Sequence, residues 1–274
     1  MSTLNRRILP GFGLSLSYAV TYLTILVLIP ITACFAKAST LTWGTFWGTV
    51  WTERARAAYL LTFGSSFTAA VVDVALGLLI AWVLVRYEFP LKRLFDSVID
   101  LPLALPTAVA GLVYSSLYVK KGWFGQFLVP LGIEGAYSRL AIVLVLTFVA
   151  LPLTVRTIQP VLATFDDETE EAAVCLGASR LKTFFYVILP LLYPAMVTGF
   201  ALAFARALGE YGSVVFVSGN MPYRTEIAPV LIVARLEEFA YGEATAIAVV
   251  LLAISFSVLI VINLLERWSN RYGG

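Results

Sequence analysis

The sequence contains no histidine and only two cysteines. Without histidine, the chain lacks the commonest general base and the commonest metal ligand of proteins. Cys34 and Cys175 lie far apart in unlike surroundings, so they give neither a disulfide framework nor the spacing of a metal site. We therefore expect no catalytic residue, no metal ligand and no cofactor bound by this chain itself.

Charged residues are also scarce, at 13% of the chain, whereas a soluble domain carries about 25%. Hydrophobic residues make up 60%. These values indicate a polytopic membrane protein whose main solvent is lipid. The net charge of +2 disfavours nucleic acid as a partner. The apolar run after the short basic N-terminus is as long as a full membrane span and too long for a cleavable signal peptide.

Six segments are apolar over roughly the 20 residues that a transmembrane helix needs. We expect an all-α membrane protein, a single transmembrane domain over residues 1–274, with spans near 14–35, 60–85, 101–119, 140–163, 187–217 and 244–265. An even number of spans places both termini on one side. The lysine and arginine distribution leans only slightly toward cytoplasmic termini.

Two loops on the opposite side have helical patterns of their own. Trp43, Trp47 and Trp51 recur every four residues and so share one helical face, which favours a helix resting in the interfacial aromatic belt. A docking surface for an outside partner is the alternative. The segment 227–239 has the length of a short helix at the outer surface, too short to span.

The loop at 164–186 interrupts the apolar pattern with a charged, helix-prone stretch, which continues to Pro190 as EEAAVCLGASRLKTFFYVILP from Glu170. It predicts a short helix that stops at Gly177, a residue suited to a left-handed turn. Ser179 can then cap an amphipathic helix that leads into the fifth span. Periodicity alone also fits an ordinary cytoplasmic connector, and the spacing of Lys182 excludes a phosphate-binding loop.

The letters of this stretch closely resemble the EAA motif in permease subunits of ATP-binding-cassette importers. The matching residues are Glu171, Ala172, Ala173, Gly177, Leu189 and Pro190, while Val187 replaces the usual isoleucine. The resemblance implies a cytoplasmic coupling loop whose short helix docks on an ATPase subunit. It also implies the type I importer fold, with six transmembrane helices per subunit and cytoplasmic termini in the inner (plasma) membrane.

Other stretches extend the resemblance over nearly the whole chain. DLPLALPTAVAGL from Asp100, ARALGEYGSVVFVSGN from Ala205 and TEIAPVLIV from Thr225 look like permeases for sulfate and thiosulfate, most of all the T-type subunit. Permeases for molybdate, tungstate or another oxyanion are the alternative. The family implies a second related permease, an ATPase dimer that binds ATP and magnesium, and an external sulfate-binding protein. Transport would proceed by alternating access.

Four charged residues lie within the expected spans: Arg156 near one end of the fourth span, and Asp73, Arg206 and Glu210. A charge at the bilayer centre costs roughly 2.5–3.5 kcal/mol on insertion scales, so it is usually paired or functional. Arg206 and Glu210 are four residues apart and can pair on one helical face. They are either a structural salt bridge or a gate on the anion path. Asp73 stands alone as a third candidate for the path or gate, and it is expected to pair with Arg206 or to be solvated near the outer end.

Two other classes of protein receive little support from the residues. An intramembrane aspartyl protease would need Asp73 and Asp100, but no G-x-G-D motif surrounds either aspartate. A self-sufficient secondary transporter would be favoured by inverted repeats, and no convincing internal repeat is present.

Overall fold

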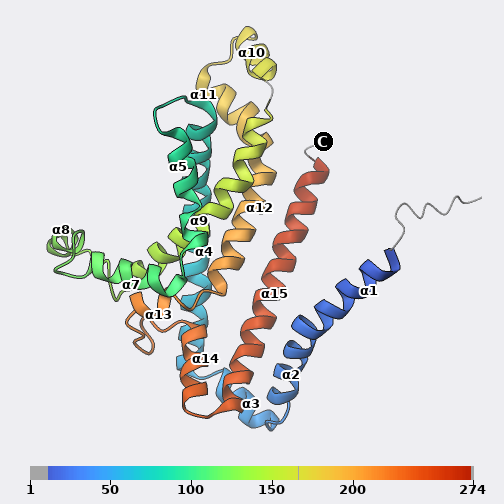
Figure 1. The fold of residues 1–274 in the computed structure, drawn as a ribbon, viewed down its shortest axis with the longest axis vertical. Coiled ribbons are helices and arrows are strands. Elements are labelled where there is room, and N and C mark those ends of the chain that lie inside the picture. Colours follow the sequence, from blue (N-terminus) through green and yellow to red (C-terminus); the bar gives the residue numbers. More distant parts are fainter. Residues whose placement is uncertain (1–11, 166, 273–274) are drawn as a thin grey trace, which may run out of the picture.

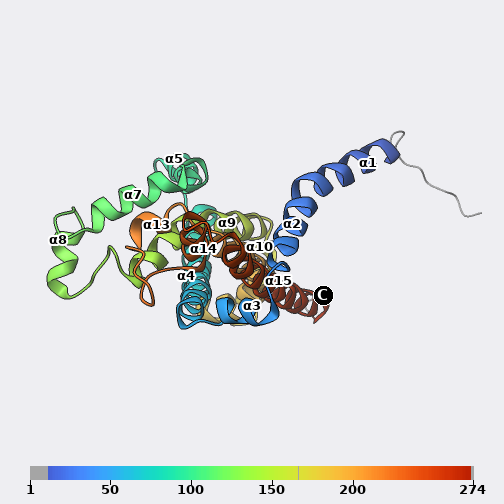
Figure 2. The ribbon, with the colours of Figure 1, turned by 90° about the horizontal axis from the view of Figure 1, so that it is seen from below.

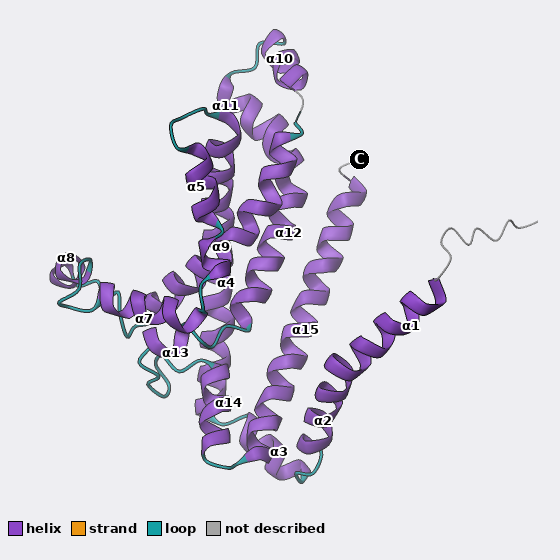
Figure 3. Cartoon of the chain, in the orientation of Figure 1, coloured by secondary structure: helices purple, strands orange, loops and turns teal. Residues whose placement is uncertain are grey.

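The computed structural model describes residues 12–165 and 167–272, and within these ranges every regular element is a helix (Figures 1 and 3). The helices are α1 (Phe12–Leu23), η1 (Thr24–Leu28), α2 (Ile29–Ala38), α3 (Trp43–Val50), α4 (Glu53–Arg86), α5 (Lys92–Ile99), α6 (Leu101–Ala104), α7 (Thr107–Tyr118), α8 (Gly125–Leu128), η2 (Val129–Leu131), α9 (Arg139–Ala163), α10 (Asp167–Cys175), α11 (Arg180–Thr183), η3 (Phe184–Ile188), α12 (Leu189–Leu208), α13 (Val214–Val217), α14 (Ala228–Glu237) and α15 (Tyr241–Tyr272).

Five helices in the described ranges are long and apolar enough to cross a membrane. They are the continuous stretches Phe12–Ala38, Glu53–Arg86, Arg139–Ala163, Arg180–Leu208 and Tyr241–Ile262. Each overlaps one of the expected spans. The second begins earlier than expected, at Glu53, because Thr52 caps it by accepting a hydrogen bond from the Ala55 amide.

The segment expected as the third span, 101–119, is not one continuous helix. It is divided into α6 and α7, with Leu105 in an extended conformation between them. Pro106 explains this break, because its ring disfavours a helical conformation at the preceding residue and it has no amide hydrogen to donate. The expected third span is therefore divided into two helices, and α5, α6 and α7 together form a bent path.

The centre of the molecule is the packing of α4, α9 and α12, which run side by side in Figure 1. Thr154 on α9 lies fully buried between Gly77 of α4 and Gly199 of α12, and its hydroxyl donates to the Gly199 carbonyl at 3.3 Å. A Cβ on Gly77 would come within 2.7 Å of the Thr154 side chain. Small residues therefore allow the three helices to approach closely, as is common inside membranes.

Two parts extend from this centre in opposite directions, as Figures 1 and 2 both show. The arm α7–α8 projects on one side. The helix formed by α1, η1 and α2 leans away on the other, and the membrane-length window within it buries none of its residues against the described chain. It approaches the bundle through its C-terminal part, α2, which packs against α15.

Two wide helical turns have a common cause. The π-helical segments η1 and η3 each lie immediately before a helix with a proline at its second residue, Pro30 and Pro190. A proline cannot donate to the carbonyl four residues earlier and its ring crowds that carbonyl, which favours a wider turn. The chain thus remains helical from Arg180 through Leu208 despite Pro190 and Pro194.

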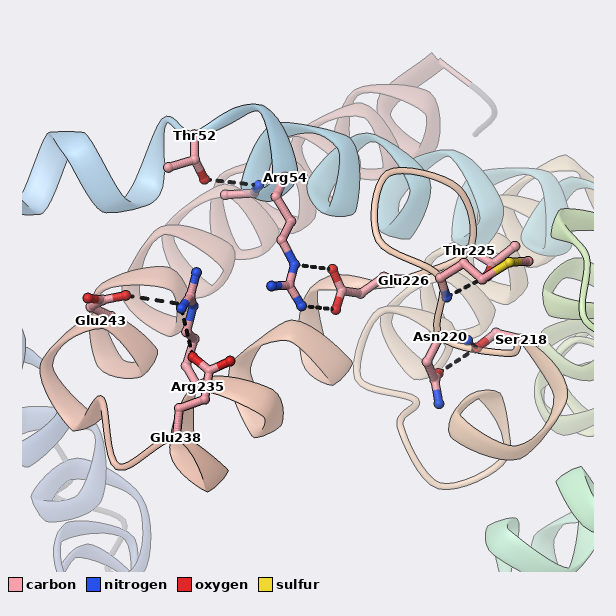
Figure 4. A network of polar contacts seen from close by, with 11 residues as sticks. Thr52, Arg54, Ser218, Asn220, Thr225, Glu226, Arg235, Glu238 and Glu243 are labelled. Atoms are coloured by element: carbon pink, nitrogen blue, oxygen red, sulfur yellow. Dashed lines mark hydrogen bonds and ion pairs between the residues drawn. The ribbon is translucent and has the colours of Figure 1, made fainter.

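The end of the molecule opposite α10 is held together by a polar network (Figure 4). Arg54 donates through Nε and Nη2 to both carboxylate oxygens of Glu226, at 2.7 and 2.6 Å. The next helix, α14, packs against α4 and α15 and buries Ala228, Val230 and Leu231. The segment expected to lie at the outer surface is therefore partly integrated into the bundle.

Candidate functional site

The loop with the EAA-like residues forms the far tip of the molecule, beyond the ends of the long helices (Figure 1). Glu171, Ala172 and Ala173 lie on α10, which ends at Cys175. Gly177 follows with a φ of +84°, the left-handed conformation that glycine adopts without the cost of a Cβ. Leu189 and Pro190 lie apart from α10, in the first turn of α12.

The second half of this loop is joined rigidly to the membrane helix. Ser179 caps α11 by accepting a hydrogen bond from the Lys182 amide at 3.4 Å, and α11, η3 and α12 then continue as one helix. On α10, Glu171 and Ala172 are exposed, and so is most of the apolar side chain of Leu176 just beyond. A helix displaying small and apolar side chains at the tip is a suitable docking element for another protein.

Arg206 and Glu210 form the expected ion pair. However, α12 ends at Leu208 and not near Val217 as expected, so Glu210 lies beyond the end of the helix. Nη1 of Arg206 donates to Oε2 of Glu210 at 2.6 Å. The backbone amide and hydroxyl of Ser213 both donate to Oε1 of Glu210, each at 2.9 Å. The carboxylate is 2% exposed, whereas the Arg206 side chain is 32% exposed, so part of the cation remains accessible.

The turn that contains Glu210 is in direct contact with α7, the last helix of the bent path formed by α5, α6 and α7. A Cβ on Gly111 of α7 would collide with the backbone of Ser213, and a Cβ on Gly212 would collide with the Thr107 hydroxyl. The two stretches therefore meet backbone to backbone. The two sequence motifs singled out around Asp100–Leu112 and Ala205–Asn220 thus form one junction beside α9.

Asp73 is not part of this junction. Arg206 pairs with Glu210 and Asp73 is fully buried, so both expectations for Asp73 were wrong. Neither carboxylate oxygen has a hydrogen-bond partner among the described residues. Its neighbours along α4 are small: Ala70 packs with Ala150 and Ala203, and Gly77 faces Thr154. An ionised carboxylate would be stranded there, so we interpret Asp73 as a buried packing residue in this conformation.

A second arginine centre was not singled out from the sequence. Arg156 on α9 binds Asp100 through Nε and Nη2, at 2.9 and 2.6 Å, and Asp96 through Nη1 at 2.6 Å. Its hydrogen bonds hold the pKa of the Asp100 carboxyl below the usual range. The available signal was the four-residue spacing of Asp96 and Asp100, which places both acids on one face of a helix. This centre fixes the bent segment to α9.

These features define a class: a helical membrane protein with an exposed helix at one tip and a bent segment packed against a partly buried ion pair. The comparison with known proteins agrees. Residues 73–271 match the family described as "Binding-protein-dependent transport system inner membrane component". The chain belongs to this family, and it is therefore a multi-pass inner-membrane permease subunit of an ABC importer.

The individual relatives cover almost the entire chain. The sulfate transport system permease protein CysT of Synechococcus elongatus is 50% identical over 92% of this chain and 91% of the relative. The protein of the same name from Escherichia coli is 43% identical over 98% of both. A bacterial alginate ABC transporter, solved with a periplasmic protein, is 16% identical and has a TM-score of 0.77 over 93% of both chains. This likeness confirms the expected all-α importer permease fold.

Proposed function

We propose that this chain is the permease subunit of an ATP-driven importer for sulfate and thiosulfate. The observation that carries the substrate class is the similarity to sulfate permeases along nearly the full length of both chains. A second, related permease would complete the membrane part. A pair of ATPase subunits would bind ATP and magnesium, and an external binding protein would deliver the anion.

The coupling role belongs to the loop 164–186. We infer that α10 docks on an ATPase subunit, with Glu171, Ala172 and Ala173 at the contact and Gly177 setting the angle to α11. Because α11 continues into α12, a displacement of the docked loop would be passed directly to a membrane helix. This role places the loop and both termini on the cytoplasmic side, so that ATP binding could drive alternating access.

Arg206 is the residue we assign to the anion path. Its guanidinium is held by Glu210 yet remains partly accessible, which would let it meet a divalent oxyanion without being a fully stranded cation. Guanidinium groups suit oxyanions because they present several N–H donors in a fixed plane. Glu210 would moderate the attraction, so that the anion is released again.

The experiment is uptake of labelled sulfate, thiosulfate and molybdate by the complete complex in proteoliposomes that contain ATP. We expect sulfate and thiosulfate to be taken up and to compete with each other. Preferential uptake of molybdate would instead support the alternative, a permease for molybdate or tungstate. Uptake without any ATPase subunit would contradict the proposal altogether.

A further inference from the structure

Arg86, the last residue of α4, lies where the docking loop meets the membrane helices. It forms an ion pair with Glu170 of α10, immediately before the exposed Glu171. The Arg86 and Glu170 side chains are only 21% and 27% exposed, so the pair is partly shielded from water. Shielded pairs lose less of their attraction to solvent and salt than those on an open surface.

Two aromatic rings enclose the same guanidinium. Its central carbon lies 5.4 Å from the ring centroid of Trp82 and 5.9 Å from that of Phe165. Both distances are within the range of a cation–π interaction. Trp82 belongs to α4, whereas Phe165 follows the end of α9, so Arg86 connects the docking helix to two membrane helices at once.

The contact continues to the third helix of the central bundle. The Trp82 ring packs edge-on against Phe184, with centroids 5.4 Å apart, and Phe184 begins the segment η3 that leads into α12. Trp82, Phe165 and Phe184 all pack against one apolar cluster that includes Ile158, Leu162 and Leu192. The ends of α4 and α9 therefore meet at the Arg86 side chain, and the helix that leads into α12 is connected to it through the contact between Phe184 and Trp82.

We propose that Arg86 is a positioning residue for energy coupling: it fastens α10 to the end of α4, so that movement of the docked loop displaces the three central helices together. This inference rests on the proposed docking of α10. Without Arg86, α10 would remain attached through its chain connections to α9 and α11 and its packing against η3, but it would lose the ion pair that joins it to the end of α4. The ATPase would still bind, because Glu171 and Ala172 are exposed and are not needed to hold Arg86.

The test uses Arg86→Gln and Glu170→Gln in the complete complex, with Arg93→Gln as the control. Arg93 is an exposed cation on the neighbouring helix α5, so the control removes the same charge. Three quantities are measured: retention of the ATPase on the purified permease, ATP hydrolysis stimulated by the binding protein, and sulfate uptake per ATP hydrolysed. We expect the Arg86 and Glu170 variants to retain the ATPase. Sulfate uptake per ATP hydrolysed should fall roughly tenfold in each, which is within the usual range of coupling between two sites.

Exchanging the two charges distinguishes a requirement for the ion pair between Arg86 and Glu170 from general damage to the fold. The double variant Arg86→Glu with Glu170→Arg restores the pair with opposite polarity, and we expect it to recover part of the uptake lost in each single exchange. The positioning role of Arg86 would be contradicted if the double variant recovered no uptake. It would also be contradicted if both glutamine variants showed normal uptake per ATP. The variant Gly177→Val tests the docking of the loop independently of Arg86. If Gly177→Val also leaves ATPase retention and sulfate uptake normal, the proposed docking role of the loop is wrong as well.

Discussion

The ion pair of Arg206 and Glu210 should respond very differently to the removal of each partner. Arg206→Leu leaves Glu210 as a carboxylate only 2% exposed with no cation beside it. Breaking a buried pair in this way costs about 3–5 kcal/mol. The two donors of Ser213 continue to stabilise the carboxylate, so we expect a loss near the lower end, about 3 kcal/mol.

Removing the acid should be milder if its hydrogen-bonding oxygen is kept. Glu210→Gln retains an acceptor for Ser213, and Arg206, being 32% exposed, can turn its charge toward water. We expect a loss of about 1 kcal/mol, the value of one ordinary hydrogen bond. Glu210→Leu should lose about 1–3 kcal/mol more, because it leaves the buried amide and hydroxyl of Ser213 without an acceptor.

The double variant Arg206→Leu with Glu210→Gln then contains no stranded charge at this turn and keeps an acceptor for Ser213, and only the neutral NH2 group of the new side chain lacks a partner. We expect it to regain most of the stability that Arg206→Leu loses, while sulfate uptake stays low because the anion path has lost its cation. Thermal unfolding of the purified complex measures the first quantity, at roughly 2–4 °C for each kcal/mol in a domain of this size. Uptake per assembled complex measures the second.

Three results would refute this reasoning. If Arg206→Leu is no less stable than Glu210→Gln, or if the double variant is no more stable than Arg206→Leu, the buried carboxylate does not depend on its cation. If the double variant transports sulfate at the normal rate, the pair is purely structural and Arg206 has no place on the anion path.

Four further predictions concern single positions. Cys175 is exposed, so a membrane-impermeant thiol reagent should miss it in intact cells of a variant lacking Cys34 but label it in inside-out vesicles; labelling from outside would invert the topology. Gly177→Val should weaken ATPase retention, measured by co-purification, because φ is +84° there; equal retention would contradict the turn's role. Asp73→Asn should leave both assembly and sulfate uptake unchanged, since the carboxyl forms no hydrogen bond; loss of uptake in an assembled complex would show that the acid itself is needed. Because the pKa of Asp100 is lowered in the folded state, its contribution to folding stability is fully present above its unfolded-state pKa, about 4, and is lost as pH falls through the lower folded value. Thermal unfolding of Asp100→Asn should not show this loss of stability in acid.

Features set by neighbouring residues were predictable from the sequence. The left-handed turn at Gly177, the cap at Ser179 and the pairing of Arg206 with Glu210 depend on spacings of a few residues, and the structure contains all three. The apolar runs likewise indicated all five membrane-length helices of the described residues. Their ends were less predictable: α12 ends at Leu208, with Gly209 as its C-cap, whereas the expected span continued to Val217.

Contacts between distant segments could not be deduced in this way. Arg156 and Asp100 are 56 residues apart, and Arg54 and Glu226 are 172 apart, so only the packed fold shows which acid each arginine meets. For Asp73, the sequence suggested a distant contact that the fold of the described residues does not contain. Its isolation within an apolar span suggested a distant partner, whereas the surrounding helices offer small and apolar side chains instead.

The contact between α2 and α15 has a consequence for how the chain is made. The Cys34 thiol lies 4.0 Å from the Thr245 carbonyl, so the first membrane helix is joined to a helix that is 211 residues later in the chain. During synthesis, the first helix enters the bilayer before α15 exists, and it remains surrounded by lipid while the central bundle forms. Its attachment therefore comes late in synthesis, and a chain that stops before α15 lacks the helix against which α2 packs most among the described residues.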